Sequence, residues 1–551
     1  MSSQVHQQKE AVIDKNDSVP GIPAEKDGLE ENEAATEKKT VAIDVDAPEA
    51  LINRELSWLS FARRVLALAE DPNLPLLERV KFAGIMGMLY DEFAMKRMGG
   101  LKRKIEKRKR KKKTKRSPDG LTAEDELQAC REELHQQARL VSQLVADTIR
   151  PDLAAAGIPI LEYAQLSDKQ QKQMQRYFIE SVEPILTPLA VDVSHPFPFI
   201  SSLGLNLAVE VTESKKKHNR FVRIKVPANR PRWVPLRDSD GFVPLEQVIA
   251  SNLELLFPKA AEFKCYFFRV TRAAKDDPWE GNILEDPEAE LIPARIIGMV
   301  TRELTARKFA GVTRLQVGAD MPKKMQRWLC EQLEAETDEL ETVEGLMSVA
   351  DLMKYRVEGY PELRDPPHHP ITHPRLRQLD PRDSTDIFTE IRKGDILLHH
   401  PYHSFDSSIL HFLKSAAVDP QVLAIKLTIY RTSSDSPIIQ ALMEATRQGK
   451  QVAVLVEITA RFDEAPNIAW GNRLEREGAH VAYGVERLKT HVKLALVVRE
   501  EMDGIRRYVH VGTGNYHTVT ARIYEDMGIL SCDPELGSNV AALFNELTSA
   551  T

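Results

Sequence analysis

Between residues 422 and 483, apolar stretches alternate with amphipathic ones, and this alternation constrains the fold more than any other feature of the sequence. Gly449 and Gly478 stand where a left-handed residue commonly ends a helix. Strands joined by helices return in the same direction, so the segment predicts a parallel sheet and an α/β fold. The predicted elements are strands over 422–430, 451–458 and 479–483, and helices over 437–448 and 467–477.

A histidine and a lysine stand two residues apart in the next predicted strand. Alternate side chains share a face of a strand, so His491 and Lys493 are predicted on one face, and Val492 and Leu494 on an apolar second face. A glycine-rich turn over 512–515 follows. A neutral imidazole beside a cation, near free backbone amides, suits nucleophilic attack on phosphorus. Alone, however, such a pair is also typical of a solvated strand edge.

Two arginines occupy equivalent places in the strand and helix alternation. Arg431 follows the first predicted strand and Arg461 follows the second. Both therefore emerge at the carboxyl edge of the sheet, where α/β proteins bind ligands, and their planar guanidinium groups match phosphate oxygens. Either arginine alone would suggest only a surface salt bridge. Together with His491 they predict a phosphate site.

The composition is that of a multidomain intracellular protein. A chain of 551 residues is too long for one core, and its formal net charge of −7 gives no global argument for binding nucleic acid. Its 4 cysteines lack paired or metal-ligand spacing, which indicates a reducing compartment and no structural zinc. No stretch predicts a leader or a transmembrane segment, so a cytoplasmic location is expected.

The part before the α/β segment divides into three regions. Residues 1–50 are polar and predict a disordered acidic tail. A helical domain is predicted over 51–150, capped by Asn53, and its basic run over 102–116 suggests a solvated loop or helix extension, with contact to a polyanion less favoured. The apolar residues that recur at helical spacing are Trp58, Phe61, Val65 and Leu68.

A mixed α/β head domain is predicted over 151–372. It contains strand-like segments at 206–211 and 221–226 and a helical one at 323–333. A proline cluster between 361 and 374 indicates a linker into a last domain over 373–551.

From about residue 51 to its end, the chain resembles the bacterial polyphosphate kinase family. This resemblance implies an N-terminal helical domain, an α/β head domain and a C-terminal phospholipase-D-like α/β domain that carries the catalytic residues. The implied reaction is the reversible transfer of the terminal phosphate of ATP to inorganic polyphosphate. The segments that carry the resemblance are 53–61, 186–190, 195–199, 388–405, 424–431, 457–464, 488–493, 512–515 and 520–524.

The resemblance also implies roles for individual residues. His491 accepts the phosphate as a phosphohistidine, which suits an imidazole that titrates near neutrality and forms a reactive N–P bond. Arg431 and Arg461 match positions assigned to a Mg²⁺ site, but guanidinium has no lone pair to donate, so we expect both to hold phosphates of the Mg²⁺ nucleotide, with Lys493 adding positive charge. Tyr524 matches a nucleotide-contacting tyrosine.

A carboxylate is expected behind the histidine to fix its tautomer, and the candidates are Asp526 first, then Glu457 and Glu464. The implied partners are ATP, ADP, polyphosphate and further copies of the chain, with Mg²⁺ as the cofactor. Nucleic acid is not expected.

The sequence departs from the family pattern at two places. Leu89 stands where the family has a nucleotide-contacting asparagine, so that contact is not carried over. The family also has a second related domain, with another active-site histidine and arginine, beyond the position of Thr551. The expectation is therefore a fragment, or a member that needs another subunit, and the activity of the chain alone stays open.

Two other functions account for parts of the sequence. A phospholipase-D-like phosphodiesterase would need an aspartate where the chain has Val498, and a second histidine and lysine motif. A polyphosphate- or nucleic-acid-binding protein could retain an incomplete site, with the basic run over 107–116 as an electrostatic patch.

Overall fold

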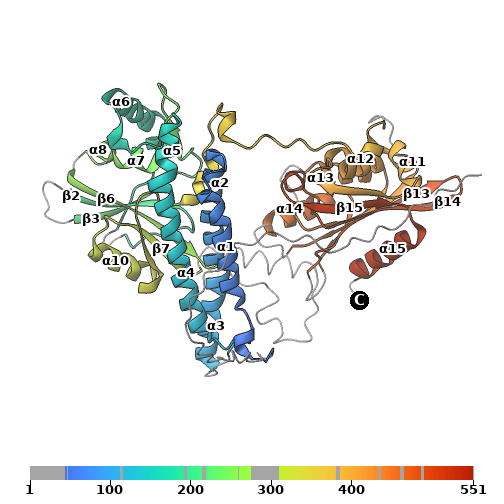
Figure 1. The fold of residues 1–551 in the computed structure, drawn as a ribbon, viewed down its shortest axis with the longest axis horizontal. Coiled ribbons are helices and arrows are strands. Elements are labelled where there is room, and N and C mark those ends of the chain that lie inside the picture. The colour runs from blue at the N-terminus through green and yellow to red at the C-terminus, as the bar shows by residue number, and fades with distance from the viewer. Residues whose placement is uncertain are drawn as a thin grey trace, which may run out of the picture.

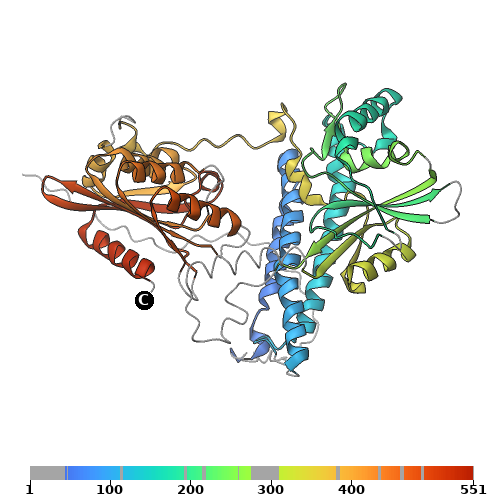
Figure 2. The same ribbon diagram turned by 180° about the vertical axis from the view of Figure 1, so that it is seen from behind.

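The computed structural model describes residues 44–45, 47–111, 116–191, 195–213, 219–258, 260–274, 310–379, 385–431, 436–458, 464–484 and 489–549. Nearly all of the tail predicted over 1–50 lies outside these ranges. Figure 1 shows long helices beside one sheet, and a second sheet reached through an extended segment. Figure 2 shows the same three parts from behind. The predicted multidomain α/β fold is confirmed.

The helical part begins as predicted but buries a different face. The Asn53 side chain accepts hydrogen bonds from the backbone N–H groups of Glu55 and Leu56 and so caps α1. The predicted apolar face of α1 is wrong in part, because Phe61 is 54% exposed and Leu68 is 39% exposed. The helices are α1 (Arg54–Glu70), α2 (Leu76–Phe93), α3 (Gly99–Lys111), α4 (Ala123–Leu144) and α5 (Arg150–Ala155), with π-helical turns η2 (Ala94–Met98) and η3 (Val145–Ile149).

The stripe of α1 that does pack inward is one position away. It consists of Leu59, Ala62, Leu66 and Ala69, which are fully buried. Both stripes have helical spacing, so periodicity cannot choose between them. The packing of α1 against α2 and α4 buries this stripe in the core of the helical part.

Within the described ranges, the head part is built on a six-stranded sheet of order β1-β3-β2-β6-β7-β8. On β2, Leu207 and Val209 pack toward α6 and α7, whereas Ala208 packs toward α10 on the other face. The elements are β1 (Leu189–Val191), β2 (Leu205–Glu213), β3 (Asn219–Lys225), β4 (Trp233–Pro235), β5 (Phe242–Pro244), β6 (Ala260–Arg272), β7 (Val312–Gly318), β8 (Leu340–Val343), α6 (Asp168–Tyr177), α7 (Leu245–Ala250), α8 (Leu253–Leu256) and α10 (Lys323–Leu333).

Buried ion pairs join the helical and head parts. Asp91 of α2 accepts a hydrogen bond of 2.7 Å from the guanidinium of Arg269 on β6, and both side chains are buried. Lys102, at the start of the basic run, pairs with buried Glu339. The run continues α3 as far as Lys111, as a helix extension, and its side chains from 110 to 115 lie outside the described residues.

The C-terminal part is, in the portion of the chain described here, a seven-stranded sheet of order β12-β11-β10-β13-β14-β15-β9. The strands β10, β11 and β12 are parallel, as predicted, and β13 returns antiparallel to β10. The elements are β9 (Ile396–His400), β10 (Val422–Ile429), β11 (Gln451–Val456), β12 (His480–Tyr483), β13 (Lys493–Glu501), β14 (Gly504–Gly512), β15 (Asp526–Ser531), α11 (Asp386–Arg392), α12 (His411–Val418), α13 (Pro437–Arg447), α14 (Glu464–Arg476) and α15 (Pro534–Ser549).

The prediction for β13 is wrong in two respects. The strand begins at Lys493, so His491 precedes it. Both of its faces are covered: Ala495 belongs to the main core, while Leu494 packs beneath α15 against Phe544. None of the helices within the described ranges combines the length and apolar character needed to cross a membrane.

Replacing Gly87 is expected to loosen the junction between the helical and head parts. An added Cβ would lie 2.3 Å from the backbone nitrogen of Ala350, in the 3₁₀ helix η9 (Val349–Lys354), and backbone cannot yield as a flexible side chain can. We expect Gly87→Ala to lower the free energy of unfolding by about 1–3 kcal/mol in urea titrations. The matched control is Gly100→Ala in α3, where the nearest heavy atom would be 3.8 Å away. An unchanged midpoint for Gly87→Ala would contradict the tight junction.

Candidate active site

The site forms where β10 ends and β13 begins. These strands are antiparallel neighbours, so the start of β13 lies beside the end of β10. The Thr428 hydroxyl accepts a hydrogen bond of 3.0 Å from the Leu494 amide and donates one of 2.8 Å to the Val492 carbonyl. This side chain therefore satisfies backbone groups at the strand end, where His491 leaves the ladder.

One aromatic ring gathers the reactive side chains. The rings of Tyr430 and His491 meet edge to face, with centroids 5.1 Å apart at 78°. The Lys493 ammonium lies 5.3 Å from the centroid of Tyr430, and the Arg431 guanidinium lies 5.8 Å from it. The electron-rich faces of aromatic rings attract cations, so Tyr430 holds both charges close to the imidazole.

The backbone on either side of the site is tied together by two buried polar side chains. Glu457, directly after β11, accepts a hydrogen bond of 2.8 Å from the Thr490 amide. The Asn467 amide donates to the carbonyl of Tyr430 at 2.9 Å and to that of Glu457 at 2.8 Å. The residues flanking His491 and Arg431 thus share one rigid support.

The surroundings keep His491 neutral. Partial burial lowers its pKa below the ordinary value, and the charges of Lys493 and Arg431 lower the pKa further. The side chain is still exposed. Lys493 is only 3% exposed and donates a hydrogen bond to the His491 carbonyl; burial lowers its pKa, while the charge of Asp526 opposes that change.

Asp526 lies at the start of β15 and binds the glycine-rich turn. Its carboxylate accepts a hydrogen bond of 2.8 Å from the Thr513 hydroxyl. A Cβ on Gly514 would come within 2.8 Å of the same carboxylate, so a side chain at this position would displace Asp526. Among the described residues, the hydrogen bonds of Asp526 do not include His491; its charge acts on Lys493 and on His400.

The glycine-rich turn was predicted to expose backbone amides, but its glycines also pack against a buried histidine. His510 is 1% exposed and its Nδ1 lies 2.8 Å from the Tyr516 hydroxyl. Burial lowers the pKa of His510 to about 3. A Cβ on Gly512 would lie 2.8 Å from this imidazole, and one on Gly528 would lie 2.6 Å from it. These glycines therefore make room for a buried neutral histidine.

The remaining predicted site residues differ in burial and in whether the structure describes them. Arg461 lies outside the described residues. Glu464 is buried at the start of α14, and Tyr524 is 63% exposed beyond β14. Leu89 lies in α2, partly buried against the helical core.

Sequence reasoning missed three residues that build the site: Thr428, Tyr430 and Asn467. Tyr430 stood beside a predicted arginine and could have been inferred as its cation-binding ring. No local pattern marks Thr428 or Asn467, because their partners are 64 and 37 residues away.

The described residues do not fit a directly bound metal. No group of three or more His, Cys, Asp or Glu side chains that could hold an ion occurs among them. Guanidinium and ammonium groups cannot donate a lone pair to a cation. The site is instead suited to anions.

An accessible neutral imidazole beside cations at the ends of strands is an arrangement suited to a phosphotransferase. Three family models divide the chain: "Polyphosphate kinase N-terminal domain" over residues 51–161, "Polyphosphate kinase middle domain" over 169–355 and "Polyphosphate kinase C-terminal domain 1" over 386–551. The chain belongs to the polyphosphate kinase family.

Relatives and a solved structure agree with this assignment. The chain is 45% identical over 514 residues to a polyphosphate kinase of Mycolicibacterium gilvum, covering 92% of this chain and 68% of the relative. It is 44% identical over 521 residues to one from Mycobacterium avium, covering 92% and 69%. The crystal structure of polyphosphate kinase from Porphyromonas gingivalis superposes with a TM-score of 0.71 at 27% identity, covering 90% of this chain and 69% of that one.

The charge of Lys493 is expected to control the titration of His491. In Lys493→Met the pKa of His491 should rise toward its ordinary value, because a positive charge that disfavours the imidazolium has been removed. Histidine NMR titration measures this shift, with His491→Gln to assign the signal. Lys426→Met is the control, since Lys426 lies on β10 and binds Asn545 instead. Equal titrations for both variants would contradict the coupling.

Proposed function

We propose that the chain transfers the terminal phosphate of ATP reversibly to inorganic polyphosphate, with His491 as the phosphate carrier. The observation that carries this proposal is the exposed imidazole of His491, whose pKa is lowered by burial, Lys493 and Arg431. A neutral imidazole has a free lone pair at neutral pH, which a nucleophile needs.

The transfer has two steps. The imidazole lone pair forms an N–P bond to the terminal phosphorus as the P–O bond to the ADP leaving group breaks. A terminal oxygen of polyphosphate then attacks that phosphorus and returns the electron pair to the imidazole. Each step moves one phosphoryl group. The protein contributes mainly by positioning the reacting groups and by placing positive charge near the transferred phosphate.

Arg431 and Lys493 supply that positive charge. Both lie against the ring of Tyr430, next to the imidazole, where they stabilise negative charge on the equatorial oxygens of the transferred group. Arg461 extends this cluster in our proposal. Asp526 acts on Lys493 and, through Thr513, on the glycine-rich turn, and so positions rather than reacts.

The nucleotide and the cation follow from the same chemistry. The exposed ring of Tyr524 is available to contact a nucleotide by stacking or by its hydroxyl group. Mg²⁺ would be part of the ATP complex, where it would neutralise phosphate charge, and Arg431 and Arg461 would bind the phosphates of that complex. We also propose that the protein is cytoplasmic and forms a homo-oligomer. The 4 cysteines are free, which agrees with a reducing compartment such as the cytoplasm.

Labelling with γ-³²P-ATP tests the carrier. We expect acid-labile, base-stable label on the unmodified chain, because N–P bonds hydrolyse in acid. The label should be lost completely in His491→Ala, because the nucleophile is removed. His480→Ala is the control, since His480 is exposed on β12, away from the site. Undiminished label in His491→Ala would sink the proposal, and no label on any form would favour a polyphosphate-binding protein.

Arg431 is expected to act on the rate of labelling. We expect Arg431→Met to slow phosphohistidine formation by about 10²–10³-fold, because one group that stabilises transition-state charge is lost. Rapid-quench labelling at several Mg²⁺ concentrations measures this effect, and chelation should abolish labelling in all forms. Lys414→Met on α12 is the control. A rate for Arg431→Met within twofold of the control would contradict the role.

A further inference from the structure

The head part carries two grooves that the proposed function does not use. The first, of about 700 Å³, lies between α6 and the residues around β4, and is called here the α6 groove. The second, of about 820 Å³, includes the end of β3 and the loop after it, and is called the Arg230 groove. Pro235 lines both grooves, so they meet at this residue.

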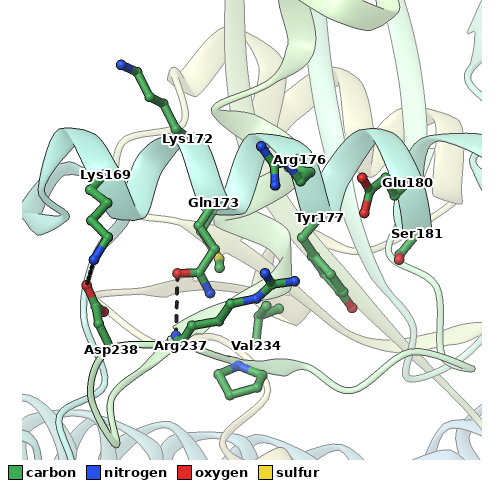
Figure 3. A pocket seen from close by; sticks show the side chains of 12 residues that line it. Lys169, Lys172, Gln173, Arg176, Tyr177, Glu180, Ser181, Val234, Arg237 and Asp238 are labelled. Atoms are coloured by element: carbon green, nitrogen blue, oxygen red, sulfur yellow. Dashed lines mark hydrogen bonds and ion pairs between the residues drawn. The ribbon is translucent and has the colours of Figure 1, made fainter.

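The α6 groove is basic. Figure 3 shows Arg237 extending along α6 toward Tyr177, while Lys169 points to Asp238 at 3.8 Å. Within the described part of the chain, the exposed guanidinium groups of Arg176 and Arg237 have no carboxylate at ion-pair distance. The charged side chains that line the groove are Lys169, Lys172, Arg176 and Arg237, with Glu180 and Asp238.

The Arg230 groove is more basic still. Its carboxylate, Asp351, already pairs with buried Arg232 and with Lys354. Exposed Lys225, Arg230 and Arg356 are left, in the described ranges, without an acidic partner.

The two grooves form one electrostatic surface. The charge of Arg230 acts on the hydroxyl group of Tyr177 in the α6 groove and partly offsets the rise in its pKa that burial causes. Apart from buried Arg232, which pairs with Glu246 and Asp351, eight basic side chains and three carboxylates line the pair, although the whole chain has a formal net charge of −7. Such a local excess of positive charge attracts and retains anions.

The shape of the surface favours a long anion without bases. Two joined grooves accommodate several successive phosphates, whereas a single phosphate would occupy one. Proteins that bind single-stranded nucleic acid stack bases on exposed aromatic rings. The aromatic residues of these grooves, Tyr177, Trp233 and Phe242, are instead buried or half-buried in the cores beneath.

We propose that the α6 and Arg230 grooves together bind a linear polyphosphate chain and retain it while it is extended. This proposal rests on the proposed function for the source of the polymer. Both grooves lie in the head part, whereas His491 lies just before β13 in the C-terminal part, so retention is separate from phosphate transfer. A retained chain does not diffuse away from the protein after each transfer, which raises its effective concentration for the next one.

Binding of end-labelled polyphosphate to the full chain tests the grooves directly. Two triple variants remove the cations of one groove each. Each variant should weaken binding about tenfold or more, and should lower the slope of log binding constant against log salt concentration by roughly one per cation lost. The variants are Lys169→Glu/Arg176→Glu/Arg237→Glu in the α6 groove and Lys225→Glu/Arg230→Glu/Arg356→Glu in the Arg230 groove. Lys323→Glu/Lys324→Glu/Arg327→Glu is the matched control, because it makes the same charge change on α10, across the head sheet. Binding by both groove variants that equals the control would overturn the proposal. An oligonucleotide that competes as well as polyphosphate of equal charge would overturn the choice of ligand.

The length of the product separates this proposal from the proposed function. The groove variants should label His491 at the rate of the unmodified chain but release shorter polyphosphate on electrophoresis. Products of full length from variants that bind polyphosphate weakly would overturn retention. If the unmodified chain takes no label, the proposed function fails, while the binding measurement still decides whether the grooves hold polyphosphate.

Discussion

The antiparallel pairing of β13 with β10 is the constraint on which the candidate site depends. Parallel strands β10 and β11 end at one edge of the sheet, and an antiparallel neighbour must begin at that edge. This geometry brings His491, 60 residues along the chain, beside Arg431. Thr428 completes the junction by bonding the backbone on both sides of Lys493. Without that pairing the histidine and the arginine would belong to unrelated loops.

The site concentrates positive charge around a side chain that must stay neutral. Lys493 is almost fully buried, but its ammonium binds the His491 carbonyl, lies against Tyr430 and faces the charge of Asp526. These contacts offset the cost of burying a cation. The positive charge of Lys493 and Arg431 also lowers the pKa of the imidazole and so favours its neutral form. Positive charge recurs at the head grooves with a different arrangement, since there it is exposed and spread over a larger surface.

The comparison between the predicted and observed helical part shows a limit of periodicity. The start of α1 was predicted correctly because Asn53 caps the helix through contacts two and three residues away. The buried face was predicted one position off, since α1 carries apolar residues on two adjacent stripes. The packing of α1 against α2 and α4 decides which stripe faces inward, and the residues of these helices come from other segments of the chain. Asp91 of α2 similarly belongs to a junction with the head part that only its pairing with Arg269 reveals.

The sequence by itself determined the alternation of strands and helices from Val422 to Tyr483, the parallel sheet, and the family to which the chain belongs, because these follow from local periodicity, turn residues and motifs. It also singled out His491, Lys493 and Arg431. Only the tertiary structure decided that Tyr430 gathers these groups, that Asp526 binds Thr513, and that the glycines enclose His510. It alone joined the basic side chains of the two grooves. The physical reason is that these contacts connect segments far apart in the chain, and their energies depend on burial and distance, which no local pattern encodes.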